Sequence, residues 1–133
     1  MSHHRELSNP AGLHPAPGFN HVAIASGTTV VHLAGQVALD PQFGLVGGDD
    51  LGEQTKAAMR NVEIALRAAG VGWDDVVRRT IYTLHPTEYE SITAAIDEVT
   101  GGAKHPAQTI VGVTGLAVPG LLIEIECTAV RGH

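Results

Sequence analysis

Apolar residues recur at three- and four-residue spacing between residues 51 and 69, which is the period of one face of an α-helix. Both ends of this segment carry residues typical of helix ends. Asp50 can accept hydrogen bonds from the free N–H groups, and Glu53 stands three residues later, as in a capping box. Gly70 supplies a left-handed residue that ends the helix. The pattern therefore predicts a helix over residues 51–69.

A second apolar stripe at the same spacing runs from Tyr89 to Val99. Thr87 is its predicted N-cap, Glu90 the predicted capping-box partner, and Gly101-Gly102 the predicted stop. The sequence thus predicts a second, shorter amphipathic helix.

Runs rich in β-branched residues lie before, between and after these helices. They predict strands over residues 22–26, 29–37, 76–84, 107–114 and 121–130. The first two runs flank Gly27-Thr28, which predicts a hairpin with its turn near the glycine. The order is ββαβαββ, an α+β domain in which both helices cover one face of a single sheet.

Residues 1–20 contain three prolines and two glycines and show no clear periodicity, which predicts an extended N-terminal arm. Residues 21–133 are expected to form one domain. A chain of 133 residues is long enough to bury a single core without disulfides.

The last predicted strand alternates between two faces. One face carries the apolar set Ile123, Ile125, Cys127 and Ala129, which favours a buried structural thiol over a nucleophile. The other face mixes apolar residues with Glu124 and Glu126. Because two helices cover only one face of a sheet, we expect the mixed face to be a subunit interface.

Charge and hydropathy exclude several partners. Eight Lys and Arg residues against fourteen Asp and Glu give a net charge of −6, which works against nucleic acid as the main partner. No apolar run approaches the roughly 20 residues of a membrane span, and the N-terminus lacks a signal-peptide pattern. The sequence therefore predicts a cytoplasmic protein.

Cofactor motifs are also missing. The chain has eight histidines, including His14, His21, His32, His85 and His105, but none has metal-site spacing, so no metal is expected. The glycines form neither a Walker nor a dinucleotide-binding pattern, and no nucleotide cofactor is expected.

Two blocks near the C-terminus are more specific. They read Pro106-Ala107-Gln108-Thr109-Ile110-Val111-Gly112-Val113 and Ile123-Glu124-Ile125-Glu126. Together with the run from Leu33 to Pro41, they closely resemble the RidA/YjgF (reactive intermediate deaminase) family, and the resemblance extends from about Pro17 to Val130. It implies a chorismate-mutase-like fold and a homotrimer whose three sheets form a central barrel, with ligand sites in the clefts between subunits.

The resemblance also implies a site. The carboxylate that positions the attacking water in the family corresponds to Glu124, which makes Glu124 the predicted catalytic residue. Four other polar contacts are changed. The predicted substrate-binding residues are Gln108 in place of an arginine, Phe19 for a tyrosine, Ala34 for a serine and Thr93 for an asparagine, with Gly35 and Ile110 beside them.

The loss of the arginine matters most. An arginine fork binds a carboxylate through two charge-assisted hydrogen bonds, whereas a glutamine offers only a neutral amide. Either Arg78 or Arg79 reaches the cleft instead, or the ligand is not the usual 2-imino acid. The alternative for these arginines is ion pairing at the surface.

Two functions from different classes follow. The first is a deaminase-like hydrolase in which Glu124 acts on an imine, enamine or related unsaturated metabolite other than the usual 2-imino acid. The second is a trimer that binds a small ligand without turnover, as a sensor or chaperone-like partner, in which Glu124 is an interface carboxylate with no catalytic task. Endoribonuclease activity, also described in the family, is disfavoured by the acidic charge and the few aromatic residues.

Overall fold

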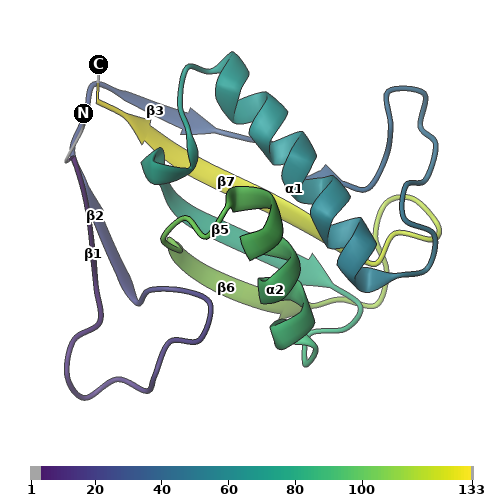
Figure 1. Ribbon diagram of the computed structural model, residues 1–133, viewed down its shortest axis with the longest axis horizontal. Coiled ribbons are helices and arrows are strands. Elements are labelled where there is room, and N and C mark those ends of the chain that lie inside the picture. The colour runs from purple at the N-terminus through teal and green to yellow at the C-terminus, as the bar shows by residue number, and fades with distance from the viewer. Residues whose placement is uncertain (1–3, 133) are drawn as a thin grey trace.

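The computed structural model describes residues 4–132, and its main body is a mixed sheet with two helices packed on it (Figure 1). The elements in chain order are β1 (Arg5–Ser8), β2 (Val22–Ala25), β3 (Thr29–His32), β4 (Gln36–Val37), α1 (Leu51–Ala68), the short 3-10 helix η1 (Trp73–Asp75), β5 (Val76–Thr83), α2 (Tyr89–Thr100), β6 (Ala107–Gly112) and β7 (Ile123–Arg131).

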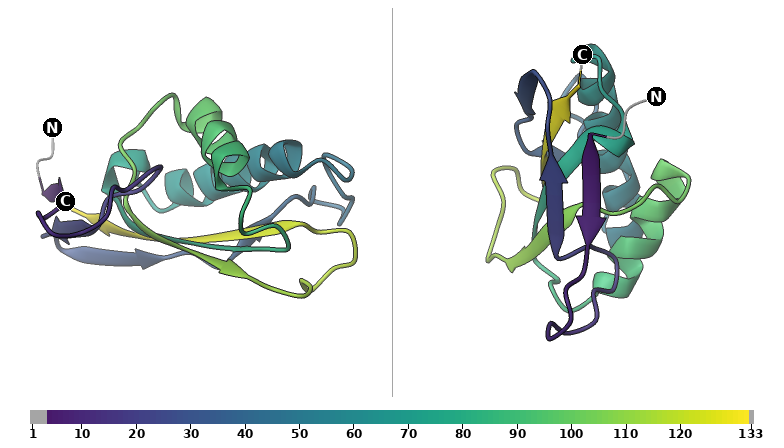
Figure 2. Two further views of the ribbon diagram at one scale, coloured as in Figure 1. Left: turned by 90° about the horizontal axis from the view of Figure 1, so that it is seen from below. Right: turned by 90° about the vertical axis from the view of Figure 1, so that its left-hand side faces the viewer.

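The main sheet has the strand order β3-β7-β5-β6, and β4 pairs with β7 further along the same edge as β3. Strands β5 and β6 are parallel, with α2 as the connection between them, and the other pairs are antiparallel. Figure 2 shows α1 and α2 on the same face of this sheet. The predicted α+β class and the one-sided helix layer are confirmed. The main sheet also has the order ββαβαββ, but its first two strands are β3 and β4, which both lie within the predicted strand over residues 29–37. The predicted strand over residues 22–26 lies in a separate sheet.

The end of each helix follows local chemistry. The Asp50 carboxylate accepts from the Glu53 N–H at 2.9 Å, and Gly70 follows the helix with a φ of +74°, so the Asp50 cap and the Gly70 stop of α1 are confirmed. The capping box is not complete, because Asp50 N donates to Gly47 O and the Glu53 side chain accepts from Lys56. Gly101 ends α2 in the left-handed conformation, as predicted. The predicted Thr87 cap is wrong: His85 O accepts from Glu88 N in a turn, so Glu88 is the N-cap and makes no side-chain cap bond.

The N-terminal region departs from prediction. Residues 5–8 form β1 within the predicted arm, and β1 pairs with β2 in a separate two-stranded antiparallel sheet. The predicted hairpin between residues 22–26 and 29–37 is therefore wrong. At the would-be turn, Thr28 N donates to Arg131 O, and a Cβ on Gly27 would collide with that carbonyl, so the chain crosses the end of β7 rather than folding back.

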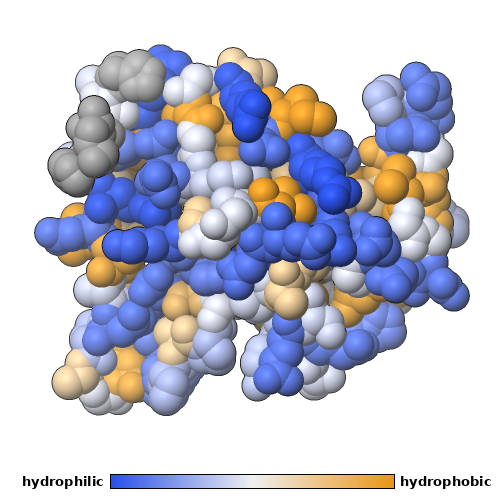
Figure 3. All heavy atoms as spheres, in the orientation of Figure 1, coloured by the Kyte–Doolittle hydropathy of each residue, from blue (hydrophilic) through white to orange (hydrophobic). Residues whose placement is uncertain are grey.

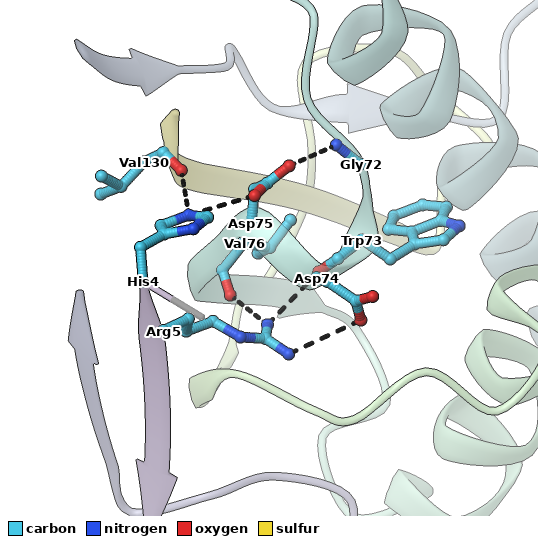
Figure 4. A network of polar contacts seen from close by, with 8 residues as sticks. All are labelled: His4, Arg5, Gly72, Trp73, Asp74, Asp75, Val76 and Val130. Carbon is cyan, nitrogen blue, oxygen red and sulfur yellow. Dashed lines mark hydrogen bonds and ion pairs between the residues drawn. The ribbon is translucent and has the colours of Figure 1, made fainter. Parts of the chain in front are cut away.

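Polar contacts fix β1 to the main body (Figure 4). The Arg5 guanidinium donates to the carbonyl oxygens of Val76 at 2.6 Å and Trp73 at 3.3 Å. The His4 ring lies 3.1 Å from the Asp75 carboxylate. These bonds hold the β1–β2 arm, and with it the loop over residues 9–21, in a set position beside the sheet.

The core lies between the helices and the sheet. Its largest fully buried side chains include Met59, Leu66, Ile81, Ile92 and Ile96 from both helices and β5. From β7 it takes the predicted apolar set Ile123, Ile125, Cys127 and Ala129. Burial raises the pKa of the Cys127 thiol to about 12, which confirms a structural rather than a nucleophilic cysteine.

Within residues 4–132, neither helix is long and apolar enough to cross a membrane.

Candidate functional site

A cavity of about 630 Å³ lies where the loop over residues 9–21 meets the edge strand β6 and the start of α2. Asn20 N donates to Pro106 O at 3.0 Å and continues the sheet edge in parallel with Ala107, which brings the loop against β6. Figure 3 shows the lower outline of the molecule deeply notched on this side. The lining residues of this cavity, which we call the Gln108 cavity, are His14, Pro15, Pro17, Phe19, His21, Pro86, Tyr89, Gln108, Thr109 and Ile110.

Three rings form its loop-side wall. His14, Phe19 and His21 contact one another edge to face, with ring centroids between 4.7 and 6.2 Å apart. His14 Nδ1 donates to Pro15 O and His21 Nε2 donates to His14 O, because a carbonyl oxygen only accepts. Within residues 4–132, no three His, Cys, Asp or Glu side chains gather as a metal site.

Gln108 is held from behind by Arg79. Arg79 is 4% exposed and occupies the neighbouring position on β5. Its Nε donates to Gln108 Oε1 at 2.5 Å, while Nη2 donates to Gly18 O at 3.1 Å and to His105 Nδ1 at 2.9 Å. An arginine can only donate, so the Gln108 oxygen must face Arg79 and the amide nitrogen must point away from it.

The chain of polar contacts continues to α2. His105 Nε2 lies 3.0 Å from Asp97 Oδ1, so the ring bridges Asp97 and Arg79. Burial, followed by the charge of Arg79, lowers the pKa of His105, which favours the neutral ring. Burial lowers the pKa of Arg79 to about 10, so the guanidinium stays charged at neutral pH.

The predicted substrate-binding residues do not all meet here. Phe19, Gln108 and Ile110 line the Gln108 cavity. Thr93 lies next to it, in a second hollow of about 340 Å³, where its hydroxyl packs on Gly18 so closely that a Cβ on the glycine would collide with it. The backbone oxygen of Ala34 accepts from the Gln36 side chain at 3.2 Å, outside the cavity.

Neither candidate arginine is among the residues that line the Gln108 cavity. Arg79 is one side chain behind it, and Arg78 donates to the Thr109 hydroxyl at 2.7 Å from the other face of the sheet. Among residues 4–132, neither arginine forms the ion pair that was the alternative: both donate to neutral oxygen atoms of β6 side chains.

Glu124 lies in a different hollow, of about 370 Å³, on the open face of the sheet. We call it the Glu124 hollow; its walls include Tyr82, Leu116 and Glu126. The Tyr82 hydroxyl donates to Glu126 Oε1 at 2.6 Å, and this bond raises the pKa of Tyr82. Gly35 lies against the Glu124 carboxylate, where any Cβ would overlap it.

Strand register explains the separation. Arg79 pairs with both Cys127 and Gln108, so all three side chains share the helix-covered face. Tyr82 pairs with Glu124 on the opposite face. Residues that the sequence assigns to one site therefore lie on two faces of the sheet in a single protomer.

Comparison with known proteins decides the family. The model of the family described as Endoribonuclease L-PSP matches residues 10–131. The chain belongs to this family. A RutC family protein of Synechocystis is 33% identical over 119 residues, covering 87% of this chain and 89% of that protein. The 2-iminobutanoate/2-iminopropanoate deaminase of Salmonella typhimurium is 30% identical over 105 residues, covering 77% and 80%.

Solved structures support the same family assignment. The crystal structure of YyfB from Yersinia pestis, a Rid family protein of unknown function, has a TM-score of 0.88 and 39% sequence identity, and covers 96% of this chain and 98% of that chain. The resemblance to the RidA/YjgF family stated from the sequence is thus confirmed for this Endoribonuclease L-PSP family member.

Sequence reasoning missed several cavity residues. His14 and His21 are seven positions apart in a proline-containing loop, and no periodic pattern indicates that their rings touch. Tyr89 was assigned only to the apolar stripe of its helix, yet it is 43% exposed and lines the cavity. His105, which bonds to Arg79 behind the cavity, had one available signal: it directly precedes the family block.

Proposed function

We propose that this protein is a RidA-like small-metabolite deaminase that hydrolyses an imine, enamine or related unsaturated metabolite other than the usual 2-imino acid. The observation that carries the proposal is the Gln108 cavity, a concave, largely apolar space with Gln108 at its wall. Family relatives named as deaminases of 2-iminobutanoate and 2-iminopropanoate support the reaction class.

The reaction needs a ligand grip and a positioned water. In the proposed step, Glu124 accepts a proton from water as the water oxygen attacks the C=N carbon, forming a carbinolamine. The carboxyl group returns this proton to nitrogen, which completes the neutral carbinolamine, and then takes the hydroxyl proton and passes it to the amino nitrogen as the C–N bond breaks. A carbonyl compound and ammonia leave, and Glu124 is again a carboxylate. Gln108, Phe19 and Ile110 hold the ligand beside this step.

The two faces of the sheet give a reason for assembly. Gln108 and Glu124 lie on opposite faces, so one protomer does not bring them together. We propose a homotrimer in which the Gln108 cavity of one protomer meets the Glu124 hollow of its neighbour. Gly35 and Ala34 belong to the Glu124 side of this shared cleft, whereas Thr93 supports the loop on the Gln108 side.

A non-catalytic ligand-binding trimer is the second candidate. It is favoured by the wall of the Gln108 cavity, whose lining residues include no carboxylate to handle the proton within the same protomer. On this reading the protein binds its ligand and releases it unchanged, as a sensor or chaperone-like partner.

Ammonia release from freshly generated imines and enamines separates the two. The deaminase proposal expects release by the wild type and a loss of about a hundredfold or more in Glu124→Gln. Glu63→Gln, which removes a carboxylate paired with Arg67 on the surface of α1, is the matched control and keeps full activity. Equal release by wild type and Glu124→Gln would remove the catalytic role of Glu124, and no release from any substrate would favour the binding protein.

A further inference from the structure

The loop between β4 and α1 exposes large apolar side chains that neither the Gln108 cavity nor the Glu124 hollow uses. Phe43 is 76% exposed, the highest fraction for a large hydrophobic residue among residues 4–132, and Leu45 and Val46 in the same loop are also exposed. We call these three residues the Phe43 tip. Figure 1 shows the loop, in blue, standing out at the end of the molecule opposite the β1–β2 arm. None of the three lines the cavity or the hollow.

The backbone at Phe43 is strained. Its φ is +65°, which makes it the one residue other than glycine with a positive φ among residues 4–132. Bulky side chains avoid this left-handed region, whereas glycine and asparagine adopt it readily. Strained residues persist where the surrounding structure holds them, and they cluster at functional sites. A strained phenylalanine with most of its surface in water therefore indicates a contact made outside the chain.

Asp40 holds Phe43 in this conformation. Asp40 Oδ1 accepts from the backbone N–H groups of Gln42 and Gly44, both at 2.8 Å. The Asp40 backbone N–H donates to Gly44 O at 2.9 Å, and Phe43 N donates to Asp40 O at 3.0 Å. Hydrogen bonds thus close the turn through both the side chain and the backbone of Asp40, and the exposed ring stands on a fixed backbone.

A buried glutamine fixes the base of the same loop. The Gln54 side chain donates to Gly48 O at 2.7 Å and to Gly120 O at 2.9 Å, and it accepts from Leu122 N at 2.9 Å. Gly120 also packs against Leu45, where an added Cβ would lie 3.3 Å from the leucine side chain. The Phe43 tip is therefore tied both to α1 and to the loop that precedes β7.

The charge around the tip has one sign. The loop over residues 113–122, which contacts Leu45 through Gly120, carries no charged residue. Lys56, the first basic residue after the tip, is already paired with Glu53 and Glu98. Residues 33–55 contain no Lys, Arg or His, and their acidic residues are Asp40, Asp49, Asp50 and Glu53.

This charge decides among partners. Nucleic acid and anionic lipid carry phosphate groups, which the carboxylates repel. A second copy of the chain that met the first tip to tip would bring the same carboxylates together. Lysine and arginine are attracted instead, and a cation also binds the face of an exposed aromatic ring such as that of Phe43.

We propose that the Phe43 tip is a docking surface for a partner protein that presents an apolar side chain flanked by lysine or arginine. The apolar side chain packs against Phe43 and Leu45, and the cations face the carboxylates around the tip. Because the loop is held before the partner arrives, binding orders little of this chain, as for the rigid aromatic anchors of other interfaces. The inference is independent of the proposed deaminase function, since neither the Gln108 cavity nor the Glu124 hollow takes part in it.

Matched peptides test the chemistry of the partner. Three pairs of end-blocked peptides carry Leu-Trp, Leu-Phe or Ile-Leu at the centre, flanked by lysine in one member and by glutamate in the other. In NMR titrations, at least one lysine peptide should shift the backbone signals of residues 40–46 and bind about tenfold or more tightly than its glutamate partner, with an affinity that falls as salt is added. No shift at residues 40–46 with any peptide, or equal affinities within every pair, would overturn the proposal.

Phe43→Asn separates docking from a structural role. Asparagine tolerates the left-handed backbone, so this variant should unfold at a higher urea concentration than the wild type and bind the lysine peptide about tenfold or more weakly. Ile64→Asn is the matched control, because it removes a side chain that is 68% exposed on α1, and it keeps the wild-type affinity. A lower unfolding midpoint for Phe43→Asn would show that the ring supports its own loop, and would contradict the proposal.

Two further measurements address the charge and the assembly. Asp49→Asn removes one exposed carboxylate beside the tip and should weaken the lysine peptide a few-fold without weakening the glutamate peptide. Light scattering should give the same mass for the wild type and Phe43→Asn. A smaller mass for Phe43→Asn would assign the tip to a contact between copies of this chain and overturn docking of a different protein.

Discussion

The Gln108 cavity and the Glu124 hollow differ in almost every physical respect, although their key residues lie only sixteen positions apart in the chain and both belong to the main sheet. The Gln108 cavity draws on the helix-covered face, where a buried arginine fixes the amide. The Glu124 hollow lies on the open face and is lined by the carboxylates of Glu124 and Glu126 and by Tyr82, whose hydroxyl bonds to Glu126 across two neighbouring strands. In the proposed reaction, the Gln108 cavity binds the ligand and the Glu124 hollow handles the protons.

The family resemblance implies that Gln108 stands where an arginine is usual, and this difference indicates that such a replacement is not a simple loss of charge. Arg79 places a guanidinium on the neighbouring strand, directly behind the substituted residue. The charge is retained inside the protein, but the surface that meets a ligand is a neutral amide. Binding and proton transfer can therefore be altered separately.

The largest expected effect separates the two hollows. Glu124→Gln removes the proton acceptor from the open face and should lower ammonia release about 10²- to 10⁴-fold. It should leave the binding of an uncharged substrate analogue in the Gln108 cavity unchanged, as NMR titration can measure. If Glu124→Gln weakens the binding of the uncharged analogue as much as it slows turnover, the two hollows do not have separate roles.

A smaller effect concerns the arginine position. Gln108→Arg alone places two guanidinium groups against each other in a buried site, and should lower the free energy of unfolding by about 1–3 kcal/mol. The swap Arg79→Gln with Gln108→Arg restores a neutral partner and should recover most of that loss. Urea unfolding of the single and double variants measures the difference.

The single Gln108→Arg variant and the double swap also test which ligand the cavity accepts. Hydrolysis of 2-aminoacrylate should be gained in the swap, because an arginine now stands directly in the cavity wall. Were the single Gln108→Arg variant as stable as the wild type, the close Arg79 to Gln108 contact would be wrong.

The smallest effect is a pH dependence on the Gln108 side. The pKa of His105 is lowered in the folded protein, so the unfolded chain binds more protons as the solution is acidified. The stability that this neutral histidine contributes is full above about pH 6.5 and is lost as the pH falls below that value.

Urea unfolding at pH 7 and pH 5 checks this expectation. His105→Gln keeps an acceptor for Arg79 and a donor for Asp97, and should lose less stability than the wild type on acidification. His32→Gln, in an exposed strand position, is the control for removing a histidine. An identical acid loss in wild type and His105→Gln would exclude His105 as its source.

Much of the fold was predictable because its signals are local. The Asp50 cap and Gly70 stop of α1 depend on neighbouring residues, and alternation along β7 separates its two faces within nine residues. The partner of β2 was not predictable. Pairing with β1 rather than β3 depends on contacts such as Thr28 with Arg131, which are distant in sequence.

The candidate site, like the fold, was predictable only in part. Residue types were found from the family blocks, including Gln108 and Glu124, but their relative placement depends on strand register. Because Arg78 and Arg79 are adjacent in β5, their side chains must point to opposite faces of the sheet. Only the pairing of β5 with β6 reveals that Arg79 is the one that meets Gln108. The ring contacts of His14 and His21 arise from the fold of a loop and have no periodic signal.

The central claim is that Gln108 of one protomer and Glu124 of another form one catalytic site, and subunit mixing tests it most directly. Gln108→Glu protein, which lacks the amide donor of the cavity wall, and Glu124→Gln protein, which lacks the proton acceptor, are each assayed alone. The two are then dissociated, mixed in equal amounts and reassembled. A site shared between subunits is restored wherever intact Gln108 meets intact Glu124, so ammonia release should return to roughly a quarter of the wild-type rate. Mixed oligomers that form but show no recovery would contradict the account.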